Sequence, residues 1–204
     1  MPVLRVGSLC TGYGGIELAL EQVFGETELV FVAENDPDAS KILAEHFPGI
    51  PNYGDISVVG WKDAGIEIDL LTAGFPCTDV SLAGGRQGLI KGNRSGLWHE
   101  IVRAIDGLSP PLVFIENVPG LLSAKTDSPV VTCPWCMGNG QGMYLLRAAG
   151  AVCGDLATRG YHTELTSVRA SEVGAPHRRE RVFLLAAQNS YRPARGQRGQ
   201  PAPG

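Results

Sequence analysis

The sequence predicts an α/β fold in which a mostly parallel sheet carries helices on both faces. Short apolar stretches of strand character alternate with stretches of helical spacing along the chain. The 204 residues are 44% hydrophobic and 19% charged, which favours a packed core over a disordered chain. Glycines and acids follow directly after several of the apolar stretches, and sheets of this kind bind ligands at the carboxyl ends of their strands.

The first half of the chain contains three strands and two helices by these criteria. An apolar strand over residues 4–9 leads into a glycine-rich turn at 11–15 and a helix over 16–24 with helical spacing of its apolar residues. A second strand covers 29–33. Pro37 suits the first turn of a helix that runs to about Phe47, and residues 68–73 form a third apolar strand.

The second half begins with a glycine-rich polar loop over 74–95. We expect a helix over 96–108, a strand over 112–115 and a helix over 143–159. Strands over 162–168 and 181–187 complete the pattern. The chain contains no internal repeat.

Composition narrows the class of protein. The longest apolar runs, such as residues 183–187, are far shorter than the ~20 residues of a membrane span. The first residues show no signal-peptide pattern, so we expect a soluble, cytoplasmic protein without membrane contact. Five cysteines at irregular spacing fit reduced thiols better than a disulfide framework.

We expect one domain over residues 1–187 and a disordered basic tail over 188–204. Six arginines lie between Arg178 and Arg198 against one acid, Glu180, so this end could contact phosphate or simply aid solubility. An insertion at about 123–142 carries Cys133 and Cys136 in a CxxC motif. One such pair is half a zinc site, and we predict ordinary thiols there and no metal.

The glycine-rich turn after the first strand predicts a nucleotide-type site. Gly12 and Gly14 let the backbone approach a ligand, but the third glycine of the dinucleotide fingerprint would fall on Glu17. Glu34, after the second strand, could accept both hydroxyls of a ribose, and Asp55 could bind an amino group. A tight structural turn and a capping aspartate remain the alternatives. Together these residues predict an adenosine pocket without a pyrophosphate.

Two further strand ends carry reactive groups. Cys77 follows the third strand behind a proline, and Glu116 ends the next strand. Alone, either residue would more often be a buried thiol or a solvated acid. At neighbouring carboxyl ends they can bracket one substrate as nucleophile and acid.

The order of these motifs resembles the cytosine-C5 DNA methyltransferases over about residues 4–187. The matching segments are Ser8-Leu9-Cys10-Thr11-Gly12-Tyr13-Gly14-Gly15, Glu34-Asn35, Gly54-Asp55-Ile56, Ala73-Gly74-Phe75-Pro76-Cys77, Phe114-Ile115-Glu116-Asn117-Val118 and His177-Arg178-Arg179-Glu180-Arg181-Val182-Phe183. The Pro-Cys and Glu-Asn-Val pair, in that order and spacing, is a highly specific signal.

The resemblance implies a Rossmann-like fold, the cofactor S-adenosylmethionine and duplex DNA as partner. The cofactor-binding residues that it implies are Leu9, Cys10, Thr11, Gly12, Tyr13, Gly14, Gly15, Glu34, Asn35, Asp55, Ile56, Gly74, Pro76 and Leu97. The catalytic residues that it implies are Cys77, Glu116, Arg179 and Arg181, with Pro76, Ser81 and Asn117 at the substrate loop. Cys77 would attack C6 of a flipped cytosine while Glu116 engages N3, so that C5 accepts the methyl group.

This sequence departs from the family in four places. Ser8 and Cys10 replace an acid and an aromatic residue, His177 stands where glutamine is usual, and the CxxC insertion is extra. After Ala187 the family continues into a target-recognition domain and a final helix, whereas this sequence ends at Gly204. The resemblance therefore implies a truncated or minimal catalytic domain, or one that a separate chain completes.

Three other hypotheses remain open from the sequence. The same chemistry could serve a tRNA cytosine methyltransferase, although nothing in the residues favours RNA. A non-catalytic remnant could bind cofactor or nucleic acid, but the retention of both Cys77 and Glu116 speaks against decay. A nicotinamide oxidoreductase is disfavoured by the glycine spacing. The leading hypothesis places the chain in a bacterial or phage restriction-modification context.

Overall fold

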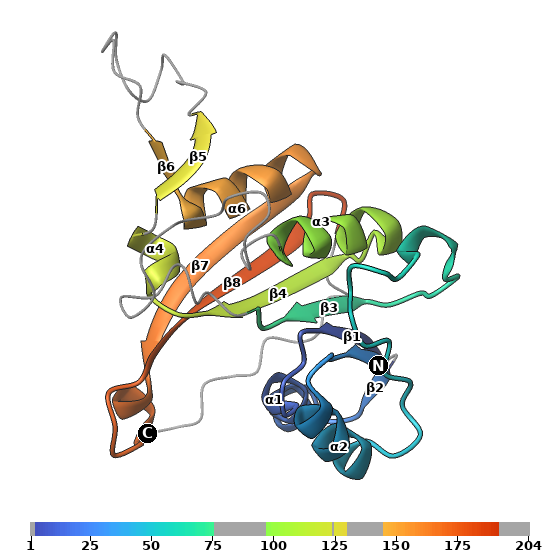
Figure 1. Ribbon diagram of the computed structural model, residues 1–204. Helices are drawn as coiled ribbons and strands as arrows, with labels where there is room; N and C mark the ends of the chain where they lie inside the picture. Colours follow the sequence, from blue (N-terminus) through green and yellow to red (C-terminus); the bar gives the residue numbers. More distant parts are fainter. Residues whose placement is uncertain (1–2, 76–96, 124, 130–144, 192–204) are drawn as a thin grey trace, which may run out of the picture.

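A six-stranded sheet forms the centre of the computed structural model, which describes residues 3–75, 97–123, 125–129 and 145–191 (Figure 1). The strands lie in the order β2-β1-β3-β4-β8-β7. Their bounds are Leu4–Leu9 for β1, Thr27–Ala33 for β2, Leu70–Ala73 for β3, Leu112–Asn117 for β4, Tyr161–Arg169 for β7 and Glu180–Gln188 for β8.

The sheet is mostly parallel, as the sequence predicts. β1 pairs in parallel with β2 and β3, and β3 pairs in parallel with β4. β8 is antiparallel to both β4 and β7. The carboxyl ends of β1 to β4 therefore share one edge of the sheet with the beginning of β8, where the sequence places most of the candidate site residues.

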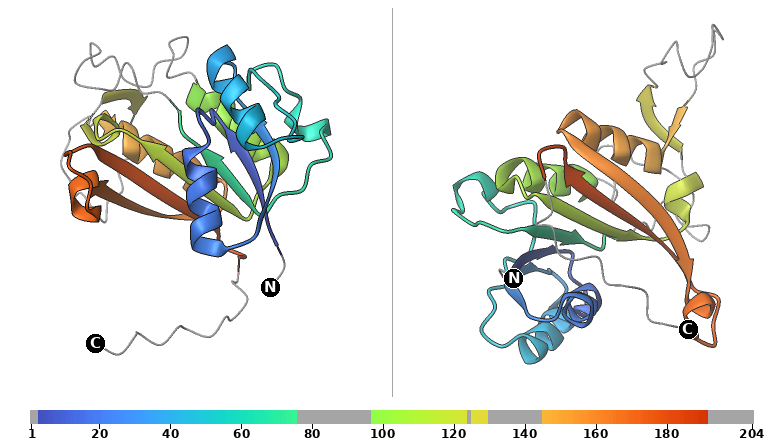
Figure 2. Two further views of the ribbon diagram at one scale, coloured as in Figure 1. Left: turned by 90° about the horizontal axis from the view of Figure 1, so that it is seen from below. Right: turned by 180° about the vertical axis from the view of Figure 1, so that it is seen from behind.

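Helices cover both faces of the sheet. Figures 1 and 2 show α3 (Leu97–Leu108) and α6 (Ala148–Thr158) on one face, with α1 (Gly15–Phe24) and α2 (Pro37–His46) on the other. Short helical turns occur at η1 (Trp61–Asp63) between α2 and α3, at α4 (Gly120–Ser123) between α3 and α6, and at η3 (Ala170–Val173) after α6. The core is continuous from the inner faces of β3, β4 and β8 to the apolar stripes of α3 and α6.

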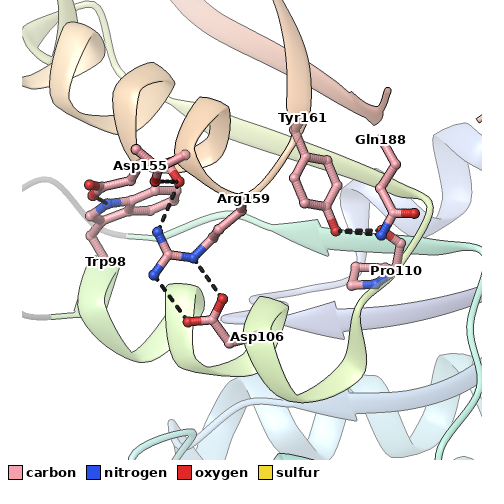
Figure 3. A network of polar contacts seen from close by, with 8 residues as sticks. Trp98, Asp106, Pro110, Asp155, Arg159, Tyr161 and Gln188 are labelled. Carbon is pink, nitrogen blue, oxygen red and sulfur yellow. Dashed lines mark hydrogen bonds and ion pairs between the residues drawn. The ribbon is translucent and has the colours of Figure 1, made fainter. Parts of the chain in front are cut away.

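Contacts at both ends of α3 hold it against α6 (Figure 3). The Trp98 indole Nε1–H donates to Asp155 Oδ2 at 2.7 Å near the start of α3. Near its end, Arg159 donates from Nε and Nη2 to the two carboxylate oxygens of Asp106, at 2.7 and 3.0 Å. On its other side, α3 packs so closely on η1 that a Cβ at Gly107 would lie 2.7 Å from the Cβ of Trp61. These contacts fix where α3 begins, and its first residue lies at the candidate site.

The prediction of a helix over 143–159 is wrong at its start. Residues Leu145–Arg147 form β6, which pairs antiparallel with β5 (Lys125–Pro129), and α6 begins only at Ala148. Backbone pairing with a distant segment here overrides the local helical pattern. Most of the expected insertion at 123–142 lies outside the described residues, and so does the expected tail over 188–204 from residue 192 onward, whereas Gln188 is the last residue of β8.

None of the helices in the described ranges has the length and apolar character needed to cross a bilayer. The longest of them, α3, has 12 residues.

Candidate active site

A hollow of about 210 Å³ opens at the carboxyl edge of the sheet. Its lining residues are Cys10, Gly12, Ala33, Glu34, Asn35, Gly54, Asp55, Ile56, Gly74 and Leu97. They come from the segments after β1, β2 and β3, from the loop before η1 and from the start of α3. All except Ala33 and Gly54 are among the residues that the resemblance implies for cofactor binding.

The turn after β1 forms one wall of the hollow with its backbone. Cys10 and Gly12 have φ angles of 50° and 58°, and the N–H of Cys10 donates to the carbonyl oxygen of Ala33 at 2.8 Å. Gly14, at φ 82°, has no room for a side chain, because a Cβ there would lie 2.6 Å from the Phe47 ring. The turn thus brings main chain, rather than side chains, close to any bound molecule.

Glu34 lines the hollow next to this turn, and backbone groups hold its carboxylate. Oε2 accepts the N–H of Gly12 at 2.8 Å, and Oε1 accepts the N–H of Asp36 at 2.8 Å. An ionised carboxylate offers about four acceptor positions, so each oxygen can accept a further hydrogen bond from a ligand.

The hollow is electrostatically negative. Burial, together with the nearby charges of Glu34 and Asp55, raises the pKa of the Cys10 thiol to about 12. Asp55 itself stays ionised, because the Ser57 backbone N–H donates to its Oδ1 at 2.8 Å and lowers its pKa. The thiol of Cys10 is therefore protonated and unreactive, while two carboxylates face the space that it lines.

An ion pair lies beside this hollow. Glu116 Oε1 is 2.6 Å from the Nε of Arg181, and both side chains are about three-quarters buried. The two residues are diagonal neighbours on one face of the β4–β8 pair, since Glu116 lies opposite Phe183 in the register. A Cβ at Gly74 would lie 3.7 Å from Glu116 Oε2, so this carboxylate lies next to a lining residue of the hollow without lining the hollow itself.

Asn117 points to the other face of β4 and holds the chain that follows β3. Its Nδ2 donates to the carbonyl oxygen of Phe75 at 3.1 Å, and its side chain is buried. The Phe75 ring packs against Trp98 with 6.0 Å between the ring centroids. The residue just before Pro76 is therefore fixed through both its backbone and its side chain.

Other expected site residues lie apart from the hollow. Leu9 is fully buried in the core, Thr11 and Gly15 belong to the turn without lining the hollow, and Tyr13 is exposed. Arg179 is exposed in the segment between η3 and β8, and the structure does not bring it to Glu116 as it does Arg181.

Several expected site residues lie outside the described ranges: Pro76, Cys77, Ser81, Cys133 and Cys136. Within the part of the chain that the structure describes, no three His, Cys, Asp or Glu side chains cluster closely enough to hold a metal ion.

Sequence reasoning missed Asn52. This side chain joins Glu34 to Gly54, two lining residues of the hollow, through hydrogen bonds of 3.0 and 2.9 Å. Its place three residues before Asp55 and next to Pro51 is a turn pattern that indicates structure but not a site.

Comparisons with known proteins agree with these motifs. The C-5 cytosine-specific DNA methylase family matches residues 4–201. The type II methyltransferase M2.BsuMI of Bacillus subtilis is 37% identical over 188 residues, which cover 90% of this chain and 42% of that protein. The type II methyltransferase M.CviJI of Paramecium bursaria Chlorella virus IL3A is 32% identical, with 93% and 44% covered.

The crystal structure of S. pombe Dnmt2 methyltransferase has the same fold. It superposes with a TM-score of 0.68 at 22% identity, over 91% of this chain and 51% of that one. The chain thus spans about half the length of the relatives that it matches.

Proposed function

Because the chain belongs to the C-5 cytosine-specific DNA methylase family, we propose that it transfers a methyl group from S-adenosylmethionine to C5 of cytosine in DNA. The observation that supports this most directly is the adjacency of two features. The hollow lined by Glu34 and Asp55 borders the Glu116 carboxylate across Gly74, which has no side chain to separate them. A methyl donor in the hollow and a cytosine held by Glu116 would then meet at this glycine.

The hollow fits the proposed cofactor. Glu34 has free acceptor positions for ribose hydroxyls, and the backbone of the turn at Gly12 allows close approach. The charges of Glu34 and Asp55 suit a cationic ligand. When bound there, S-adenosylmethionine supplies an electrophilic methyl group whose bonding electrons stay with the departing sulfur.

Activation of the cytosine is proposed for Cys77 and Glu116. The Cys77 thiolate adds to C6 of a cytosine turned out of the duplex, and the electrons of the C5–C6 double bond move into the ring. Glu116, with a proton on its carboxyl group, donates that proton to N3 and so stabilises the added charge, and the proton returns to Glu116 when the thiolate later leaves. C5 is then electron-rich enough to attack the methyl group.

The reaction is completed by loss of the C5 proton to a base. The electrons of that C–H bond restore the C5–C6 double bond, and the thiolate of Cys77 leaves. Arg181, held against Glu116 at 2.6 Å, is proposed to keep that carboxylate oriented and to contact the cytosine O2. Arg179, exposed before β8, is proposed to contact DNA rather than the reacting ring.

Duplex DNA is the proposed substrate, since the relatives are named as type II methyltransferases. Each of these relatives is more than twice as long as the region that matches this chain. We therefore propose that target recognition comes from sequence outside that region, either within the same protein or in a separate chain. The proposed setting is the cytoplasm of a bacterium or of an infected host cell.

Transfer of labelled methyl groups to mixed-sequence duplex DNA tests this function. The chain is compared with Cys77→Ala and with Cys153→Ala, a matched control because Cys153 is a half-buried thiol in α6 away from the hollow. We expect label at cytosine C5 with the wild type and the control, and none with Cys77→Ala. Turnover by Cys77→Ala would overturn the covalent mechanism, whereas failure of the wild type to bind S-adenosylhomocysteine would overturn the function itself.

A further inference from the structure

We propose that Asn52 is a positioning residue for the cofactor, which holds Glu34 in the position that recognises a ribose. This inference rests on the proposed function, because it assigns Asn52 to the same hollow. Asn52 does not line the hollow itself, and its effect is exerted through Glu34.

The Asn52 amide uses its full hydrogen-bonding capacity on three elements. Its Oδ1 accepts the N–H of Glu34 at 3.0 Å and the N–H of Gly54 at 2.9 Å. Its Nδ2 donates to the carbonyl oxygen of Glu34 at 3.1 Å and to the Oγ of Ser40 in α2 at 3.0 Å. The Ser40 hydroxyl donates in turn to the same Glu34 carbonyl at 3.1 Å. One side chain thus clamps both backbone groups of Glu34.

The carboxylate of Glu34 is fixed separately by the N–H groups of Gly12 and Asp36. With the backbone held by Asn52 and the carboxylate held by these groups, Glu34 has little freedom to adjust to a ligand. Gly54, the other partner of the Asn52 oxygen, directly precedes Asp55. The amide therefore also ties Glu34 to the loop that leads to Asp55.

Burial does not account for this arrangement. Asn52 is exposed, so water could replace its amide as the hydrogen-bonding partner of Glu34, Gly54 and Ser40 if the side chain were removed. The fold also has other ties at the same place, because the Val32 N–H donates to Pro51 at 3.0 Å and the Tyr53 N–H donates to Val32 at 2.9 Å. Loss of the Asn52 side chain should therefore leave the fold intact and loosen Glu34.

Affinity for two ligands tests the inference by calorimetry. The probes are S-adenosylhomocysteine and its 2′,3′-dideoxy analogue, which lacks the ribose hydroxyls. The variants are Asn52→Ala, which removes all four hydrogen bonds, and Asn52→Asp, which keeps the accepting oxygen and loses both donated bonds. Asn189→Ala, an exposed asparagine after the far end of β8, is the matched control. Thermal melting of each variant checks that it is folded.

We expect the wild type and the control to prefer the natural ribose, and Asn52→Ala to lose at least tenfold in affinity for S-adenosylhomocysteine with little change for the dideoxy analogue. The affinity of Asn52→Asp for S-adenosylhomocysteine should lie between those of the wild type and Asn52→Ala, and this variant provides the test if Asn52→Ala does not fold. Equal losses for both ligands, or an unchanged preference, would overturn the positioning role while leaving the function in place. A folded wild type that binds neither ligand would overturn the proposed function and this inference with it.

Discussion

The Nε of Arg181 lies 2.6 Å from Oε1 of Glu116, so residues 65 positions apart form one acidic-basic pair beside the hollow. The antiparallel pairing of β8 with β4 produces this contact, because it returns the start of β8 to the carboxyl end of β4. A parallel β8 would place Arg181 at the opposite edge of the sheet. The single reversed strand is therefore what completes the candidate site.

Glu116→Gln should slow methyl transfer by roughly 10²- to 10⁴-fold, the usual contribution of a positioned acid or base. The amide retains the shape of the side chain but loses the charge that pairs with Arg181. DNA affinity, measured by fluorescence anisotropy, should change little, and Glu45→Gln, at an exposed acid of α2, serves as control. Equal losses in rate and in DNA affinity would contradict a role for Glu116 in the chemistry.

Asn117→Ala should lower the methyl-transfer rate while S-adenosylhomocysteine affinity is retained. The substitution removes the donor to the Phe75 carbonyl, which leaves a buried acceptor unpaired at a cost of about 1–3 kcal/mol. The chain entering Pro76 and Cys77 then loses its backbone anchor. Single-turnover kinetics and calorimetry on the same preparation separate the two effects, and a large loss of cofactor affinity would argue for general unfolding of the edge instead.

The sheet and the glycine turn could be predicted from the sequence because both depend on local patterns. Buried strands such as Leu70–Ala73 read as apolar runs, and Gly12 and Gly14 mark a left-handed backbone that residues with a side chain rarely adopt. Glu34 could be assigned to a ligand pocket because it follows β2 at the edge that the carboxyl ends of the parallel strands share.

Other features depended on contacts that no local pattern encodes. β6 forms at Leu145–Arg147 only because β5 pairs with it, so a helical pattern was misleading there. The choice of Arg181 over Arg179 as the partner of Glu116 follows from the β4–β8 register. The four hydrogen bonds of Asn52 join segments that only the fold brings together.

Cys10 should resist alkylation by iodoacetamide in the folded protein well above pH 9. Burial and the nearby acids raise its pKa from 9.0 to about 12, so the reactive thiolate forms only near that pH. Because the folded-state pKa is the higher one, the contribution of Cys10 to stability is complete below pH 9 and is lost as the pH rises towards 12. Mass spectrometry of the Cys10 peptide, native and in denaturant, gives the rates. Similar rates in both states at pH 9 would show an open, ordinary thiol.

Trp98→Phe should destabilise the protein more than Asp106→Ala, although both substitutions break a contact between α3 and α6. Trp98 is buried, and its loss removes the hydrogen bond to Asp155, which is worth roughly 1.5–3 kcal/mol when the acceptor is charged. Asp106 pairs with Arg159 through both oxygens, but its side chain is 52% exposed, so we expect a loss of about 1 kcal/mol or less that shrinks at high salt.

Urea denaturation at low and high salt measures both changes in free energy of unfolding. Asp155→Asn keeps the volume of the acceptor but not its charge. Its loss of unfolding free energy should lie between the losses from Trp98→Phe and Asp106→Ala, and it shows whether charge or packing dominates at Trp98. Because Trp98 also packs on Phe75 and follows Leu97 at the hollow, Trp98→Phe should in addition weaken S-adenosylhomocysteine binding, whereas Asp106→Ala should not. A larger loss of stability from Asp106→Ala, or equal effects on binding, would mean that the exposed end of α3, and not its buried start, anchors the helix at the site.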